Sequence, residues 1–164
     1  MRHRLLGVAT VVGLLAGAAP VGAQRWPHGY GAAITLETAK RAAAAAADEA
    51  RRHNWTTAIA VVDTAGNLVY FEKLDGTQTA SVKVAMAKAR SSVLFKRPTK
   101  AFEDALAQGG STTLRLLAME DVVPDEGGYP LLVGDAIVGA IGVSGGATAA
   151  QDGQCAIAAA NALK

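Results

Sequence analysis

The chain has 164 residues, with 16 lysines and arginines against 14 aspartates and glutamates, which gives a formal net charge of +2. Because this charge is small and no basic block is interleaved with aromatic residues, the sequence does not support nucleic-acid binding. One cysteine excludes an internal disulfide, and the three histidines lack the spacing of a structural zinc site or of covalent haem attachment, so no metal site is expected.

Residues 1–23 have the three parts of a signal peptide. Met1–Arg4 is basic, Leu5–Ala19 is apolar, and Val21–Ala23 supplies the small residues that precede a cleavage site. We therefore expect the mature protein to begin at Gln24 and to be exported to the periplasm or the medium. The apolar run of about fifteen residues is too short to span a bilayer, so no stable membrane insertion is expected.

The rest of the chain has the size of one domain, which we assign to residues 34–164. Residues 24–33 are rich in glycine and are expected to form a flexible arm, in which His28 is solvated or, alternatively, a mobile metal or haem ligand. Thr35 is placed to cap a helix over Leu36–His53. The central run of alanines favours this helix and allows it to pack closely.

A β-hairpin is predicted next. Residues Thr57–Asp63 are almost continuously apolar or β-branched, which is typical of a strand covered on both faces. Leu68–Leu74 follows after a short turn that contains a glycine, so the two strands are expected to be antiparallel. The Asp63 side chain is expected to accept hydrogen bonds from backbone N–H groups of the turn.

Helical segments are predicted between this hairpin and the next, over residues 81–95, 100–108 and 112–119. Thr79 or Ser81 is placed to cap the first helix, Pro98 ends it, and Thr99 is placed to cap the second. In the first helix, lysine and arginine side chains recur on one side and apolar side chains on another.

After a loop over residues 122–126, Tyr129–Val133 and Ala136–Val143 are predicted to form a second hairpin, and Asp152 to cap a last helix over Gly153–Leu163. Hairpins in place of alternating strands and helices indicate an α+β fold. We expect a central antiparallel sheet built from hairpins and flanked by helices, with profilin-like or PAS-like layering. The alanine-rich helices at both ends predict a homo-oligomer, because they present small faces to a partner.

The glycine-rich loop at residues 142–146 fits the nucleophile pattern G-x-S-x-G around Ser144. In that hydrolase fold the histidine follows the serine, and here no histidine lies beyond His53, so a serine hydrolase is not supported. We expect the loop to offer backbone N–H groups and Ser144 Oγ to an anionic ligand, or else to be a tight turn over the core. Replacing Gly145 by valine should then block the ligand and cost the fold only about 1 kcal/mol.

Segments in a fixed order resemble the GlcG/HbpS family, which includes the C-terminal domain of PduO. They are VVDTAGNLV at 61–69, KAR at 88–90, RPT at 97–99 and GGYPLLVGDAIVGAIGVSGGATAAQD at 127–152. The resemblance covers about residues 34–163. It implies a small α+β oligomer of a family in which several members bind haem. Some members are exported and linked to haem degradation, whereas others belong to glycolate or propanediol gene neighbourhoods and have no settled activity.

The resemblance therefore implies an exported protein that binds haem without a covalent bond. The residues assigned to this cofactor are Lys83, Arg90, Thr99, Ser144 and Gly145. Thr99 is the match for a threonine placed at the haem in exported members, and Ser91 is a second equivalent. The cations for the haem propionates could come from Lys83, Arg90, Lys96, Arg97 and Lys100, which could equally form a solvated helix face. The axial ligand is left open among His53, Met86, Met119 and Tyr129.

Two alternatives stay open. In the first, the protein is a small enzyme or binding protein for a hydroxy acid or a similar small anionic metabolite, with Asp152, Lys83 and Ser144 as weak catalytic candidates. In the second, it is a structural or sensory partner of another exported protein. Cys155 is expected to be a small buried hydrophobe, with a reactive pocket thiol or an intersubunit disulfide as alternatives.

Overall fold

The computed structural model describes residues 28–164, so the predicted signal peptide and the first part of the predicted arm lie outside the described residues. The helices are α1 (Leu36–Arg52), α2 (Ser81–Leu94), α3 (Lys100–Gln108), α4 (Ser111–Leu117) and α5 (Ala149–Asn161). The strands are β1 (Gly29–Tyr30), β2 (Ala58–Asp63), β3 (Leu68–Lys73), β4 (Gly128–Val133) and β5 (Ala136–Ser144). None of the helices in this part of the chain combines the length and apolar character needed to cross a membrane.

The sheet is built around β5. Both predicted hairpins are present, since β2 pairs antiparallel with β3 and β4 pairs antiparallel with β5. The hairpins join where β2 pairs antiparallel with β5, with Ala58 opposite Ser144. The predicted α+β fold is confirmed, although the sheet is mixed because β1 lies parallel to the start of β5.

Part of the predicted flexible arm is held against the domain. Gly29 and Tyr30 pair with Ala136 and Ile137 of β5. The Tyr30 hydroxyl donates a hydrogen bond to the Val93 carbonyl at 2.8 Å. The prediction of a free arm was wrong for these residues, because β5 extends beyond the end of β2 and leaves backbone groups that a further strand can pair with.

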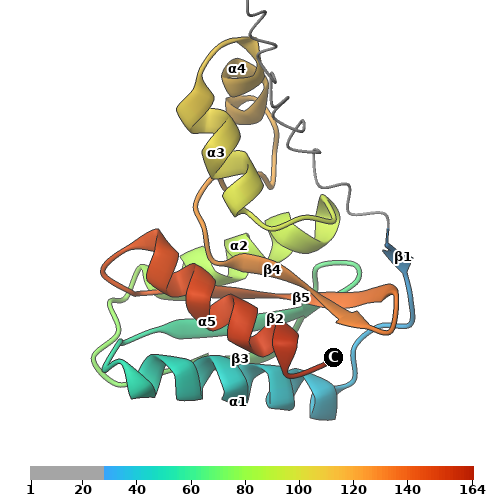
Figure 1. Cartoon of the computed structure of the whole chain (residues 1–164), viewed down its shortest axis with the longest axis vertical. Coiled ribbons are helices and arrows are strands. Elements are labelled where there is room, and N and C mark those ends of the chain that lie inside the picture. The colour runs from blue at the N-terminus through green and yellow to red at the C-terminus, as the bar shows by residue number, and fades with distance from the viewer. Residues whose placement is uncertain (1–27) are drawn as a thin grey trace, which may run out of the picture.

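Helices cover both faces of the sheet, with α1 and α5 on one face and α2 on the other (Figure 1). Alternate residues of β2 point to opposite faces, as the strand period requires. Ile59 and Val61 pack with α1 and α5, whereas Ala58, Ala60 and Val62 pack with α2. The prediction that this strand is covered on both faces is confirmed.

The alanine faces of the two terminal helices pack against each other within one chain. The buried alanines are Ala39, Ala42, Ala43, Ala46, Ala47 and Ala50 of α1 and Ala156, Ala159 and Ala160 of α5. Small side chains let these helices approach closely, so the faces that we expected to contact another subunit are already covered. The homo-oligomer stays a prediction, and its original reason no longer applies.

Several predicted helix caps differ in the structure. Thr35 caps α1 as predicted, because its side chain accepts a hydrogen bond from the Thr38 N–H. Ala80, rather than Thr79 or Ser81, precedes α2 and makes no side-chain cap. Helix α5 starts earlier than predicted, and its capping side chain belongs to Thr148.

Helices α3 and α4 project from the sheet as a pair (Figure 1). Helix α4 has large exposed apolar side chains, with Leu114 70% and Leu117 67% exposed. Thr99 precedes α3 at the predicted position, but its side chain makes no cap hydrogen bond. The Thr99 side chain points instead to the start of β4, next to the site described below.

Candidate functional site

A buried lysine joins three separate segments at one end of the sheet. Lys88 of α2 has a fully buried side chain, and its ammonium group donates hydrogen bonds to Asp152 Oδ2 at 2.9 Å and to the Glu126 carbonyl at 2.7 Å. The same ammonium lies 2.7 Å from Asp125 Oδ2. A buried charge is tolerated only when it is paired and hydrogen-bonded. Here the Lys88 ammonium group binds acceptor oxygens of both α5 and the loop before β4.

Asp152 binds the glycine-rich loop as well as the lysine. Its Oδ1 accepts a hydrogen bond from the Gly146 N–H at 2.9 Å, and its side chain is buried. Burial raises the pKa of the Asp152 carboxyl group, while the Lys88 ammonium and the Gly146 N–H act to lower it. Asp152 therefore lies in the first turn of α5 as an ion-pair partner, and the prediction that it caps this helix was wrong.

Two backbone N–H groups at the end of the glycine-rich loop are bound by the chain itself. The Gly146 N–H donates to Asp152, and the Ala147 N–H donates to Gln151 Oε1 at 2.8 Å. Ser144 is buried at the end of β5. This arrangement favours the second interpretation of the loop, a tight turn over the core.

The backbone at position 145 requires a glycine. Its φ is +132°, a region that side chains rarely adopt, and an added Cβ would lie 2.5 Å from the Thr56 carbonyl oxygen. A valine here would strain the backbone and collide with it. The expectation that Gly145→Val costs only about 1 kcal/mol was therefore wrong, because the glycine is needed by the fold whether or not a ligand binds.

Two glycines let the start of β4 lie directly against the backbones of α2 and β5. A Cβ on Gly128 would lie 2.4 Å from the Lys88 carbonyl oxygen, and one on Gly127 would lie 2.5 Å from the Val143 carbonyl oxygen. Thr99 is fully buried beside them, and its Oγ1 accepts a hydrogen bond from the Gly128 N–H at 2.9 Å. Ser91, its alternative, is also fully buried.

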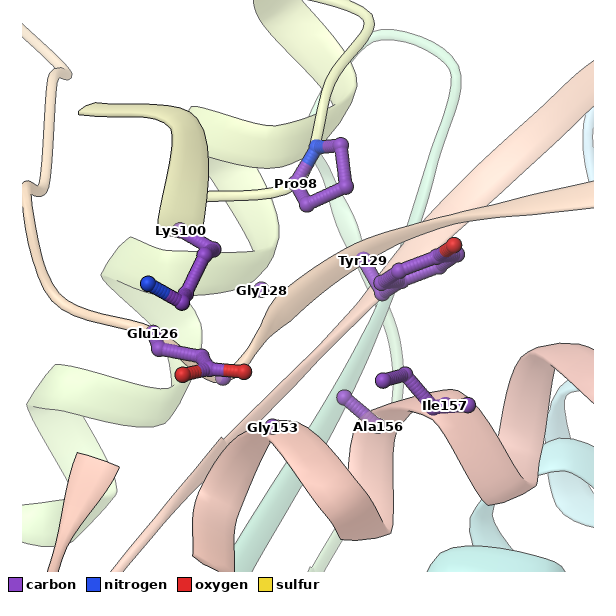
Figure 2. A pocket seen from close by; sticks show the side chains of 9 residues that line it. Pro98, Lys100, Glu126, Gly128, Tyr129, Gly153, Ala156 and Ile157 are labelled. Atoms are coloured by element: carbon purple, nitrogen blue, oxygen red, sulfur yellow. The ribbon is translucent and has the colours of Figure 1, made fainter. Parts of the chain in front are cut away.

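A pocket of about 200 Å³ lies next to the buried lysine (Figure 2). It is lined by Pro98, Lys100, Glu126, Gly127, Gly128, Tyr129, Gly153, Ala156 and Ile157. The ring of Tyr129 and the side chains of Pro98 and Ile157 form an apolar side, and Glu126 and Lys100 lie on the other (Figure 2). The pocket is thus formed by the starts of α3 and β4 and by α5.

None of the residues that we assigned to the cofactor or to catalysis from the sequence lines this pocket. Lys83 is exposed on α2. Arg90 donates a hydrogen bond from Nη1 to the Gly66 carbonyl at 2.9 Å, and its Nε lies 3.6 Å from Asp121 Oδ1. Of the other side chains considered, Lys100 and Tyr129 line the pocket, while Thr99 and Asp152 lie next to its lining residues.

Glu126 is the pocket residue that sequence reasoning missed. Its backbone N–H donates to Glu103 Oε2 at 2.7 Å, and its carboxylate lies so close to α5 that a Cβ on Gly153 would come 2.2 Å from Oε1. Burial raises the pKa of the Glu126 carboxyl group; Lys100 acts to lower this pKa, and Glu103 acts to raise it. The only signal in the sequence was a glutamate directly before a Gly-Gly turn.

Cys155 lies in α5 with its side chain buried in the core, as the first of the three interpretations predicted. Burial, with a smaller contribution from the Asp152 carboxylate, raises the pKa of its thiol to about 12. A thiol that stays protonated at neutral pH is a poor nucleophile, so this geometry does not support a reactive pocket cysteine.

Comparison with known proteins shows that the chain is similar to members of one family. A sequence model of the family described as "Haem degrading protein HbpS-like" matches residues 34–161. Protein GlcG of Escherichia coli strain K12 is 35% identical over 111 residues, which cover 68% of this chain and 81% of GlcG.

Solved structures are similar over most of the described residues. A double mutant of Streptomyces reticuli HbpS has a TM-score of 0.74 and 33% identity, with 90% of this chain and 98% of that chain covered. A haem complex of PduOC has a TM-score of 0.71 over 80% of this chain and 96% of that chain. Its identity of 24% makes this a likeness of fold alone.

Proposed function

The chain belongs to the HbpS-like family, and from this membership we propose that it is an exported protein that binds or handles haem. The family match over residues 34–161 carries the proposal, since it spans strands β2 to β5 and the helices that line the pocket. The signal-peptide pattern of residues 1–23 supports export.

The pocket fits one edge of a haem. A cavity of about 150 Å³ accommodates benzene, so a pocket of about 200 Å³ has room for one ring of a tetrapyrrole and not for all four. The ring of Tyr129 and the side chain of Ile157 offer apolar contacts to such an edge, and Lys100 offers a cation for a propionate. When bound, haem would supply iron redox chemistry, while these residues would hold and orient its edge.

The pocket contains few conventional ligands for haem iron. Within residues 28–164, no histidine, methionine or cysteine lines it. His53 lies elsewhere, with Nε2 3.2 Å from Glu49 Oε1 and its ring stacked on Trp55. Tyr129 is the lining residue of a type that ligates haem iron in other proteins. Binding at this edge is thus proposed to depend on apolar contact and charge more than on iron ligation.

A hemin titration tests this proposal. We expect the mature protein to give a saturable shift of the Soret band. Ile157→Asp, at the exposed apolar wall of the pocket, should weaken hemin binding by about tenfold, because it removes apolar contact and repels propionates. Val133→Asp changes a similarly exposed apolar residue away from the pocket and should retain wild-type affinity. A wild-type protein that gives no saturable shift would contradict the proposal.

Export has its own test. We expect the protein recovered from the periplasm or the medium of a bacterial host to have the mass of a chain that begins at Gln24. Processing should depend on the small residues before the cleavage site, so Ala23→Arg should leave the precursor uncut. An exported wild-type protein that retains Met1 would show that residues 1–23 are not a cleaved signal peptide.

A further inference from the structure

The carboxylate of Glu126 makes no hydrogen bond or salt bridge within the described part of the chain, although Lys100 acts on it as an opposite charge. Its side chain points into the pocket from the end of the loop before β4 (Figure 2). The contacts around it involve the residue's backbone, which accepts from Lys88 Nζ and donates to Glu103 Oε2. A half-buried carboxylate without a hydrogen bond is costly, and a ligand with an N–H or O–H donor would satisfy it.

The charges around Glu126 are mostly negative. Lys100 lies on the same side of the pocket, but its ammonium group is paired with Asp104 Oδ1 at 2.5 Å. Glu103 and Asp104 both act on Glu126 as like charges. Lys88 is held by Asp125 and Asp152. Lys88 and Lys100 act on Glu126 as opposite charges, but both are shared with other carboxylates. The charge next to Glu126 therefore favours a cation over a ligand carboxylate.

The rest of the lining sets the size and character of the ligand. Pro98, Tyr129, Ala156 and Ile157 present apolar surface opposite the carboxylate (Figure 2). The volume of about 200 Å³ is sufficient for one ring or a short branched chain. A ligand that uses the whole pocket would therefore combine a compact apolar body with a polar group at one end.

We propose that this pocket binds a small primary amine in its protonated form, with the ammonium group on the Glu126 carboxylate and the apolar body against Tyr129 and Ile157. This ligand class goes beyond the proposed haem function and is opposite in charge to a hydroxy acid. A haem edge and the amine would use the same apolar wall, so they should exclude each other. The amine site needs only residues of one chain.

Three ring-matched probes test the charge preference. Benzylamine, benzyl alcohol and benzoate share one ring and differ in a cationic, neutral or anionic end group. In NMR titrations of the labelled protein at neutral pH, we expect benzylamine to bind about tenfold more tightly than benzyl alcohol, and benzoate most weakly. The perturbed amide signals should include those of Gly127, Gly128 and Gly153. Benzoate binding as tightly as benzylamine would overturn the proposal, and so would the absence of saturable binding by all three probes.

A matched pair of variants assigns the preference to one side chain. Glu126→Gln keeps the shape of the side chain and removes its charge, so the preference for benzylamine over benzyl alcohol should disappear while benzyl alcohol still binds. Glu120→Gln removes an exposed charge from the same connection between α4 and β4 and should leave the preference unchanged. A preference that survives in Glu126→Gln would contradict the assignment.

Hemin titration of the same proteins separates the two proposals. A benzylamine preference that depends on Glu126, in a protein that gives no Soret shift, would support the amine site and contradict the haem function. Saturable hemin binding without any benzylamine preference would support the haem function and contradict the amine site. If both ligands bind, added benzylamine should lower the apparent affinity for hemin, and independent binding would contradict a shared apolar wall.

Discussion

Replacing Lys88 by methionine is expected to destabilise the fold by about 3–5 kcal/mol. Methionine fills a similar volume, so the loss comes from the partners that it leaves behind. Asp152 would stay buried without its cation, and the Glu126 carbonyl would lose its donor. Asp125 is 45% exposed and can be hydrated, so Asp152 accounts for most of the effect.

The same helix offers a matched control. Lys83→Met changes an exposed lysine of α2 and should alter the free energy of unfolding by less than about 0.5 kcal/mol. Urea denaturation of both variants, followed by circular dichroism, measures the difference. The double variant Lys88→Met/Asp152→Asn should be more stable than Lys88→Met alone, since it removes the buried, unpaired charge of Asp152. A loss below about 1 kcal/mol for Lys88→Met would show that the ion pair is not buried in solution.

The elements of the fold that could be predicted depend on local patterns. The apolar run of β2 showed a strand buried on both faces, and the turn after it was specified by Asp63. Asp63 Oδ1 accepts hydrogen bonds from the N–H groups of Ala65 and Asn67, both at 2.9 Å, as an Asx-type turn requires. These interactions span only a few residues, so the sequence alone contains the information.

The site could not be predicted in the same way because its contacts span long distances in sequence. Lys88 looks like one more cation on a helix until the Asp125 loop and α5 are brought against it. Asp152 has the residue type of a helix cap, but Thr148 is closer to the end of the extended segment and takes that role. Glu126 becomes a pocket residue only because Gly153 leaves room for its carboxylate on α5.

The positions of the glycines in the sequence indicated the region of the site, but the structure uses these glycines differently from the ligand-binding role that we considered first. We expected the glycines at 142–146 to serve an anionic ligand or else to form a tight turn over the core, and the structure favours the second, with glycines bringing backbone against backbone. At Gly128 and Gly142 the neighbour is the main chain of α2. The pocket is a consequence of this close packing, since it opens where β4 passes between α2 and α5.

Gly142→Ala is expected to destabilise the protein by about 3 kcal/mol or more, although it adds a single methyl group. An added Cβ would lie 2.0 Å from the Ala85 carbonyl oxygen and 2.5 Å from the Ala89 nitrogen. Both atoms belong to the backbone of α2, so no side-chain rotation can relieve the contact. The helix would have to move away from β5, and Lys88, which lies next to Ala89, would move with it. The variant should therefore also weaken ligand binding in the pocket.

Gly29→Ala provides the comparison, because an added Cβ there meets no atom within 4 Å. It should change the free energy of unfolding by less than about 0.5 kcal/mol in the same urea experiment. The NMR signals of the Gly127 and Gly128 amides should shift in Gly142→Ala and stay in place in Gly29→Ala, since only the first change displaces α2. A Gly142→Ala protein with wild-type stability would mean that α2 lies farther from β5 than the structure shows, and the buried position of Lys88 would then be in doubt as well.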